Sequence, residues 1–125
     1  IFDDFALTGD INHTYASPGF KTIRIRGLFP SIKFGSGSTL INPDKLKIFT
    51  IDQWGSMVFS DLTDAFRWCS NLRYAATDSP NFGLHCDNLS GMFEGAYYFN
   101  GDISNWDVSS IINMSYMFQK IILAT

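Results

Sequence analysis

Apolar residues recur in a fixed pattern along the second part of the chain. Trp54 precedes Phe66 by 12 residues, and Trp106 precedes Phe118 by the same distance. Phe93 lies between the two phenylalanines, 27 residues after the first and 25 before the second. The pattern therefore predicts three units with a period of about 26 residues, a length typical of leucine-rich-type repeats.

The chemistry of the units agrees position by position. Counted from the central phenylalanine, apolar residues occupy positions −4, −1, +3 and +6, which are Leu62, Leu89 and Met114; Ala65, Met92 and Met117; Cys69, Ala96 and Ile121; and Leu72, Phe99 and Ala124. Position −5 carries residue types that favour a helix N-cap, namely Asp61, Asn88 and Asn113. Apolar positions at −4, −1, 0 and +3 fit one face of a short helix. We predict short helices near 61–69, 88–95 and 113–120, with extended stretches near 72–77 and 99–104.

The first part of the chain has the period of β structure. Residues 20–26 alternate apolar and polar side chains and are rich in β-branched types. Residues 10–15 and 31–34 are two further candidate strands, and a turn at 42–44 predicts a boundary between residues 1–44 and residues 45–125. Two or three strands alone are marginal in water, so this part is expected to pair with other strands or to pack on the repeats.

Composition narrows the classes of function. The net charge is −3, with 9 basic and 12 acidic residues and no basic run, which argues against nucleic acid as a partner. The sequence has neither an apolar run long enough to span a membrane nor a visible signal peptide. We therefore expect a fragment or a processed piece of a longer protein.

The sequence around Trp106 resembles the repeat of BspA-like bacterial surface proteins, also described as mycoplasma-type lipoprotein repeats of unknown function. The resemblance rests on residues 99–110, FNGDISNWDVSS, and 113–118, NMSYMF. It covers roughly residues 48–118. After Phe118 the register is lost, so we expect the last unit to be truncated.

The first part resembles the PKD-like domain that often precedes such repeats, through residues 13–15, HTY, residues 18–20, PGF, and the strand that follows. The opening strand of that family, with its tryptophan, glycine, aspartate and glycine turn, is missing. Together the two resemblances imply an α+β chain. A short leucine-rich-repeat-like solenoid, with one helix and one short parallel strand per unit, would follow an incomplete antiparallel β-sandwich segment.

The resemblance implies a bacterial cell-surface or secreted protein that acts outside the cell in adhesion and binds proteins or glycans. Because the sequence shows no catalytic or cofactor motif, we expect neither an enzyme nor a bound cofactor. The alternatives are a carbohydrate-binding accessory module of a secreted hydrolase and a purely structural spacer. Exposure of Trp54 and Trp106 distinguishes them, because exposed coplanar rings would favour sugar stacking. Since both occupy the same repeat position, we expect them in the core. Open repeat ends are also expected to favour self-association.

The candidate partner-binding residues belong to the extended stretches. Asp52, Thr77 and Ser104 form one predicted column, and alternation turns this column away from the core, onto a face of the kind that binds ligands in repeat proteins. A solvated face without a partner is the simpler alternative. The neighbouring column consists of Thr50, Ala75 and Asp102. The predicted partner-binding residues are Thr50, Asp52, Thr77, Asp102 and Ser104.

Other candidate sites are weaker. Asn12, Asn88 and Asn113 begin glycosylation motifs, but capping already explains the last two. The two cysteines and two histidines lack metal-ligand spacing, and a disulfide between Cys69 and Cys86 remains an open alternative. No nucleophile–base pair or phosphate loop is recognisable, and the carboxylates that could serve as catalytic groups are Asp3, Asp4 and Glu94. The sequence therefore predicts neither a metal nor a cofactor.

Overall fold

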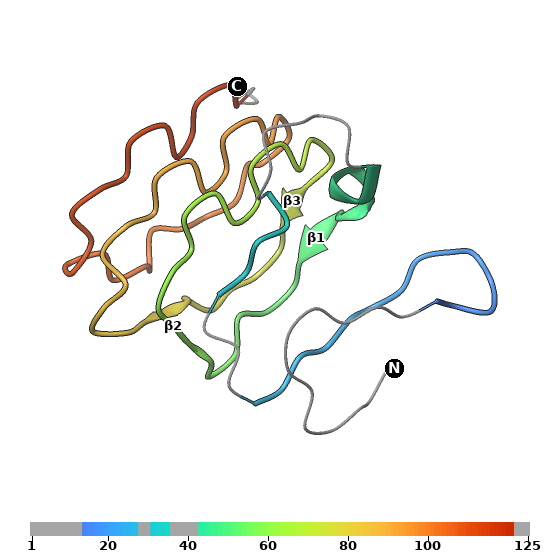
Figure 1. Ribbon diagram of the computed structural model, residues 1–125, viewed down its shortest axis with the longest axis horizontal. Coiled ribbons are helices and arrows are strands. Elements are labelled where there is room, and N and C mark those ends of the chain that lie inside the picture. Colours follow the sequence, from blue (N-terminus) through green and yellow to red (C-terminus); the bar gives the residue numbers. More distant parts are fainter. Residues whose placement is uncertain (1–13, 28–30, 36–42, 122–125) are drawn as a thin grey trace.

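The computed structural model describes residues 14–27, 31–35 and 43–121 (Figure 1). A short 3-10 helix, η1 (Pro43–Lys47), precedes four two-residue strands. They are β1 (Thr50–Ile51), β2 (Val58–Phe59), β3 (Arg73–Tyr74) and β4 (Asn81–Phe82). β1 pairs with β3 and β2 with β4, both in parallel.

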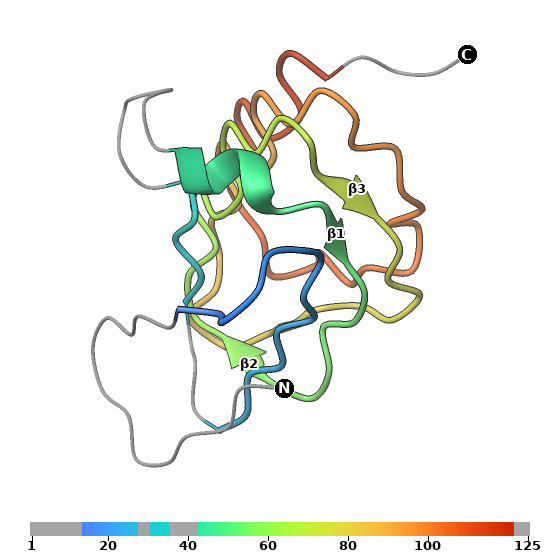
Figure 2. The ribbon, with the colours of Figure 1, turned by 90° about the vertical axis from the view of Figure 1, so that its right-hand side faces the viewer.

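Successive passes of the chain lie side by side, as both ribbon views show (Figures 1 and 2). Thr50 pairs with Arg73 on one side of the molecule, and Val58 pairs with Asn81 on another. Isolated parallel bridges join two further pairs of segments, Ser31 to Asp61 and Asn88 to Asn113. Each pairing joins segments from neighbouring passes, so like positions of successive units stack on one another.

The helices predicted near 61–69, 88–95 and 113–120 are wrong, because the structure has consecutive turns there. The carbonyl of Leu62 accepts the N–H of Ala65 at 3.1 Å, and that of Phe66 accepts the N–H of Cys69 at 3.1 Å. The third residue of the first turn, Asp64, has a φ of 55°, as a type II turn requires. Turns that join residues three apart place apolar side chains at −4, −1, 0 and +3 on the inside, which is also the spacing of a helix face.

The remaining amides of the first two turn segments bond to the next unit. The N–H of Phe66 donates to the carbonyl of Met92 at 2.8 Å, and the N–H of Phe93 donates to that of Met117 at 3.0 Å. The flanking amides repeat the arrangement two residues away on each side. An α-helix would direct these amides to carbonyls four residues earlier within the same segment. Bonds between units therefore take the place of helical bonds.

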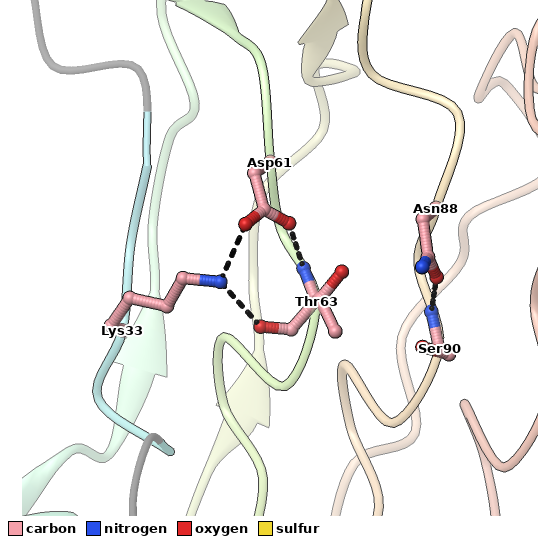
Figure 3. A network of polar contacts seen from close by, with 5 residues as sticks. All are labelled: Lys33, Asp61, Thr63, Asn88 and Ser90. Carbon is pink, nitrogen blue, oxygen red and sulfur yellow. Dashed lines mark hydrogen bonds and ion pairs between the residues drawn. The ribbon is translucent and has the colours of Figure 1, made fainter.

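The predicted cap residues do accept capping hydrogen bonds, but they begin turns rather than helices (Figure 3). The side chain of Asp61 accepts the N–H of Thr63 at 2.9 Å, and that of Asn88 accepts the N–H of Ser90 at 2.8 Å. The third unit repeats the bond, with Asn113 accepting the N–H of Ser115 at 2.9 Å. Asp and Asn side chains that accept a hydrogen bond from the backbone two residues later occur in turns as well as at helix N-caps. The residue type alone therefore does not distinguish a turn from the start of a helix.

Residues 14–27 hold no strand, which contradicts the strand predicted over 20–26. Phe20 and Ile23 are 86% and 64% exposed. A strand needs a hydrogen-bonded neighbour, and the segments that the structure describes offer none there. The candidate strand at 10–15 lies largely outside the described residues.

Residues 31–34, the third strand predicted for the first part, instead lie against the first repeat unit. Beside the bridge from Ser31, the N–H of Gly35 donates to the carbonyl of Ala65 at 3.0 Å. The rings of Phe34 and Phe66 are 5.8 Å apart. This segment is therefore the first layer of the stack in the described part of the chain.

The core is a column of aromatic rings along the stack. Phe66 and Phe93 lie parallel with centroids 5.8 Å apart, and Phe93 and Phe118 follow at 6.1 Å. The flanking leucines Leu62 and Leu89 are fully buried. Each such side chain stabilises the fold by about 1.5–3 kcal/mol through burial. The central phenylalanine of the repeat thus holds neighbouring units together.

Candidate interaction surface

The predicted partner-binding residues lie on an exposed face that β1, β3 and residues 100–104 form, which we call the strand face. Inward residues alternate with outward ones, since Ile51 and Ala76 are buried. Gly101 lies against the ring of Tyr74, which leaves no room for a side chain there, so residues 100–104 run along β3. All five predicted residues are exposed: Thr50, Asp52, Thr77, Asp102 and Ser104.

Their grouping into columns differs from the prediction by two residues in the middle unit. Thr50 pairs with Arg73 rather than lying beside Ala75. The N–H of Ala75 instead donates to the carbonyl of Ile51, at 3.1 Å. The middle unit has Ser79 and Pro80 where the other units have their tryptophan neighbourhood. The sequence therefore had no anchor for the register of this unit.

A buried aromatic group supports the strand face from beneath. Trp54 and Trp106 are each 7% exposed, which confirms that they belong to the core. Both indole N–H groups donate to the hydroxyl of Tyr74, at 2.7 Å and 3.1 Å. Because the two rings are buried and nearly perpendicular, at 82°, they cannot stack on a sugar.

A carboxylate fixes the corner next to this group. Asp78 accepts the backbone N–H of Trp54 at 3.0 Å and that of Gly55 at 2.8 Å. Asn105 donates to the carbonyl of Thr77 at 3.0 Å, which ties the third pass to the second. The strand face is thus held by bonds between units on its edge as well as by the rings below it.

Arg73 and Tyr98 complete the strand face, and neither was predicted from the sequence. The guanidinium carbon of Arg73 lies 5.2 Å from the centre of the Tyr98 ring, and Tyr98 is 50% exposed. Arginine and tyrosine are enriched at the energetic centres of interfaces. Arg73 follows the buried Leu72, so alternation carried through the stretch near 72–77 would have placed it outward.

The charges on the face are mixed. Asp102 accepts the N–H of Ser104 at 2.9 Å, and hydrogen bonds from Ser104 lower the pKa of that carboxyl. Asp107 has the same relation to Ser109, whose hydrogen bonds lower its pKa as well. Together with Arg73, Asp102 gives the strand face charges of both signs. No catalytic arrangement is evident among the described residues of this face.

A second aromatic group lies where the turn segments end. Trp68, the tryptophan outside the repeat pattern, lies against Gly95, whose φ is 74° and where no side chain would fit. The ammonium of Lys120 is 4.8 Å from the Trp68 ring centre, and the ring of Tyr97 approaches at 6.3 Å. Trp68, which belongs to the first unit, therefore contacts both the second and the third unit. The sequence does contain a signal for this contact: position +2 is a large aromatic residue in the first unit and a glycine in the second.

The described residues of the weaker candidate sites form neither a disulfide nor a catalytic group. Cys69 and Cys86 are unpaired and buried. Burial raises the pKa of the Cys69 thiol to about 12, and burial also raises that of Cys86. Glu94 lies 3.0 Å from the Nε of Arg67 and is buried, so it forms an ion pair within the stack. The residues Asp3, Asp4, Asn12 and His13 lie outside the described residues.

Within the described ranges, no three His, Cys, Asp or Glu side chains gather in a way that could hold a metal ion. Nor does any helix in those ranges have the length and apolar character to cross a membrane.

Comparison with known proteins gives one result. A family model described as "Mycoplasma protein of unknown function, DUF285" matches residues 60–122, half of the 125-residue chain. No curated protein and no solved structure matches. The matched residues contain the three stacked turn segments, from Asp61 to Ile121. The chain therefore belongs to the Mycoplasma protein family of unknown function DUF285.

Proposed function

We propose that the chain is a non-enzymatic interaction module that binds a protein or a glycan through its strand face. The observation that carries this proposal is the composition of that face. Three passes of the chain contribute exposed polar side chains together with Arg73 and the half-exposed Tyr98. A face of this kind, built from repeated positions on a fixed base, is what repeat proteins use to bind partners.

The proposed fold is a short solenoid of the leucine-rich type, in which stacked turns take the place of the helices. Parallel pairing between neighbouring passes and the phenylalanine column support it. The resemblance to BspA-like repeats and to a PKD-like domain supports a bacterial surface or secreted protein that acts outside the cell in adhesion. The DUF285 match agrees with a mycoplasma-type protein at a coarser level.

Binding to arrays of glycans and extracellular-matrix proteins tests this function. We expect the wild-type chain to bind at least one class of ligand, and the double variant Arg73→Ala/Tyr98→Ala to lose most of that binding. The matched control is Asn81→Ala, which removes an exposed polar side chain from β4, outside the strand face. Equal binding by the double variant and the control, or no binding by the wild type, would contradict the proposal.

The carbohydrate-binding accessory module remains a second candidate function, but it depends on other aromatic residues than those named from the sequence. Trp54 and Trp106 are buried, so this candidate now rests on the partly exposed rings of Trp68 and Tyr97. The same arrays distinguish the two candidates. If Trp68→Ala loses glycan binding while Arg73→Ala keeps it, the accessory module is favoured and the strand-face proposal fails.

A further inference from the structure

The register of the strand face brings two carboxylates into one row across its three passes. Ala75 of the middle pass lies beside Asp52, because the N–H of Ala75 donates to the carbonyl of Ile51. On its other side Ala75 lies beside Asp102, because Gly101 lies against the ring of the tyrosine that precedes Ala75. All three outward residues are exposed. We call Asp52, Ala75 and Asp102 the acidic row.

The middle position of the acidic row leaves space between the two carboxylates. Neighbouring passes of a parallel pair lie about 4.8 Å apart, so the two aspartates are about 10 Å apart along the row. Between them stands only the methyl group of Ala75, which is shorter than the outward side chains of Arg73 and Thr77 on the same pass. An ammonium or guanidinium group placed above this methyl group would have a carboxylate on either side.

In the described ranges, neither carboxylate of the acidic row has an ion-pair partner. Basic side chains of residues 20–26 line a hollow together with Asp52, but none of them is within ion-pair distance of it. Hydrogen bonds from Ser104 hold the pKa of Asp102 below its ordinary value, so this carboxyl is charged at neutral pH. The acidic row is therefore open to a positive charge from another molecule.

The cation of the strand face is held away from the acidic row. The guanidinium carbon of Arg73 lies 5.2 Å from the centre of the Tyr98 ring. Tyr98 and Asp102 stand two residues before and two residues after Asn100, the neighbour of Arg73 on the third pass. The ring and the acidic row thus lie on opposite sides of Arg73. The contact with the ring separates the positive charge of the face from its two negative charges.

The same contact bears on the class of partner. A sugar would stack on the face of an aromatic ring, and the guanidinium of Arg73 already lies over the ring of Tyr98. The tryptophans beneath the strand face, Trp54 and Trp106, are buried. The strand face therefore offers separated charges rather than a free ring, and this favours a protein partner over a neutral glycan.

We infer that the strand face binds a protein segment that places an arginine or lysine side chain on the acidic row, above Ala75. Within the proposed function, on which this inference rests, the partner class narrows from proteins or glycans to proteins with an exposed basic residue. Opposite charges across an interface speed association and fix its register, and like charges exclude acidic segments and anionic glycans. Arginine suits the row best, because its planar fork has donors for both carboxylates.

Selection of short random peptides, displayed on phage, on the immobilised wild-type chain tests the inference. The selected peptides should share an arginine or lysine. Asp52→Asn/Asp102→Asn should weaken their binding about tenfold or more, and so should Ala75→Lys, which supplies the cation from the chain itself. The matched control is Asp87→Asn/Asp107→Asn, which removes two exposed carboxylates outside the strand face. This control has the same net charge as the first variant and should bind as the wild type does.

Replacing the shared basic residue of a selected peptide by glutamine gives the sharpest result. The change should weaken binding to the wild type about tenfold and leave binding to Asp52→Asn/Asp102→Asn unchanged, because the two changes remove the same interaction. Tryptophan fluorescence checks that each variant is folded.

Peptides without a shared basic residue, or equal binding by the aspartate variant and its control, would overturn the inference. If binding then still depends on Arg73 and Tyr98, the proposed function stands without this partner. If the chain binds neither peptides nor any ligand of the arrays, both fail.

Discussion

At the scale of single residues, the turns depend on a backbone conformation that recurs at positions −2 and +2 of each unit. Trp68 and Lys120 both have a φ of 63°, and Gly95 at the same position has a φ of 74°. Side chains other than glycine rarely adopt a positive φ. The sequence could not reveal this conformation, because only one of the three units carries glycine at +2.

Gly95→Ala tests the contact between Gly95 and Trp68. The positive φ alone costs alanine about 1–2 kcal/mol, and overpacking against the Trp68 ring adds about 1–3 kcal/mol. We expect a loss of about 2–5 kcal/mol in the free energy of unfolding, measured with urea. Gly55→Ala is the control, because Gly55 has a φ of 75° and open space around it. Equal losses in the two variants would mean that the ring contact is unimportant.

Tyr74→Phe tests the hydroxyl that accepts both indole N–H groups. The change leaves the N–H groups of Trp54 and Trp106 without their acceptor beneath the strand face, at about 1–3 kcal/mol for a buried donor. We expect a loss of about 2–3 kcal/mol in the free energy of unfolding. Tyr98→Phe removes the hydroxyl of an exposed tyrosine and should change it by less than about 0.5 kcal/mol. A neutral Tyr74→Phe would contradict the arrangement.

At the scale of the elements, sequence periodicity located the turn segments but misassigned their type. The positions of Leu62, Phe66 and Cys69 were correctly placed inside, since all are buried. Their spacing fits a helix face and a run of turns equally well. What decides between them is where the remaining amides bond, and their acceptors lie about 26 residues away on the next unit. That information is not contained in any single unit.

The strand face was predictable for a different reason. Alternation of inward and outward residues is local, so the exposure of Asp52 and Ser104 followed directly from the sequence. The pairing of residues across the face depends on distant parts of the sequence, so the predicted register of the middle unit was wrong by two residues. Arg73 and Tyr98 were missed because the prediction relied on positions whose residues are chemically alike in successive units. The residues at the positions of Arg73 and Tyr98 differ from unit to unit.

The turn segments also predict a dependence of stability on pH. Burial acts to raise the pKa of Asp61, but hydrogen bonds from Lys33, at 2.8 Å, and from Thr63 outweigh it and hold the pKa below its ordinary value of 3.8. A lowered pKa stabilises the fold above that value, and the contribution is lost as the pH falls through the folded pKa. The ion pair is exposed, so it contributes about 0–1 kcal/mol.

Asp61→Asn, which reproduces the residue of the other two units, should keep the bond from Thr63 and lose the one from Lys33. Urea unfolding should show a small loss of stability at neutral pH. The difference from the wild type should shrink below about pH 4. Lys33→Met should reduce the acid sensitivity in the same way. A difference that stays constant from neutral to acidic pH would show that Asp61 has no such role.

At the scale of the whole molecule, the chain is a series of layers, and in the turn segments the bonds between layers run from the N–H groups of one unit to the carbonyls of the next. The segment 31–35 lies on the acceptor side of the first unit, where Lys33 donates to the carbonyl of Thr63 at 3.0 Å. In the described part of the chain, the N–H groups of Tyr116, Phe118 and Lys120 have no backbone acceptor. The two sides of a turn segment therefore differ, because its carbonyls face the segment before it and its N–H groups face the segment after it. At β1 and β3 the direction is reversed, since the N–H groups of Arg73 and Ala75 donate to the earlier pass.

Amide hydrogen exchange followed by NMR tests this layered arrangement most directly. We predict that the amides of Gly91, Phe93 and Gly95 exchange slowly, and that those of their equivalents, Tyr116, Phe118 and Lys120, exchange far faster in dilute protein. The reason is that only the first set donates to a following unit. If the second and third units were helices, Phe118 and Phe93 would be protected alike. Equal protection at these paired positions would contradict the stacked-turn account.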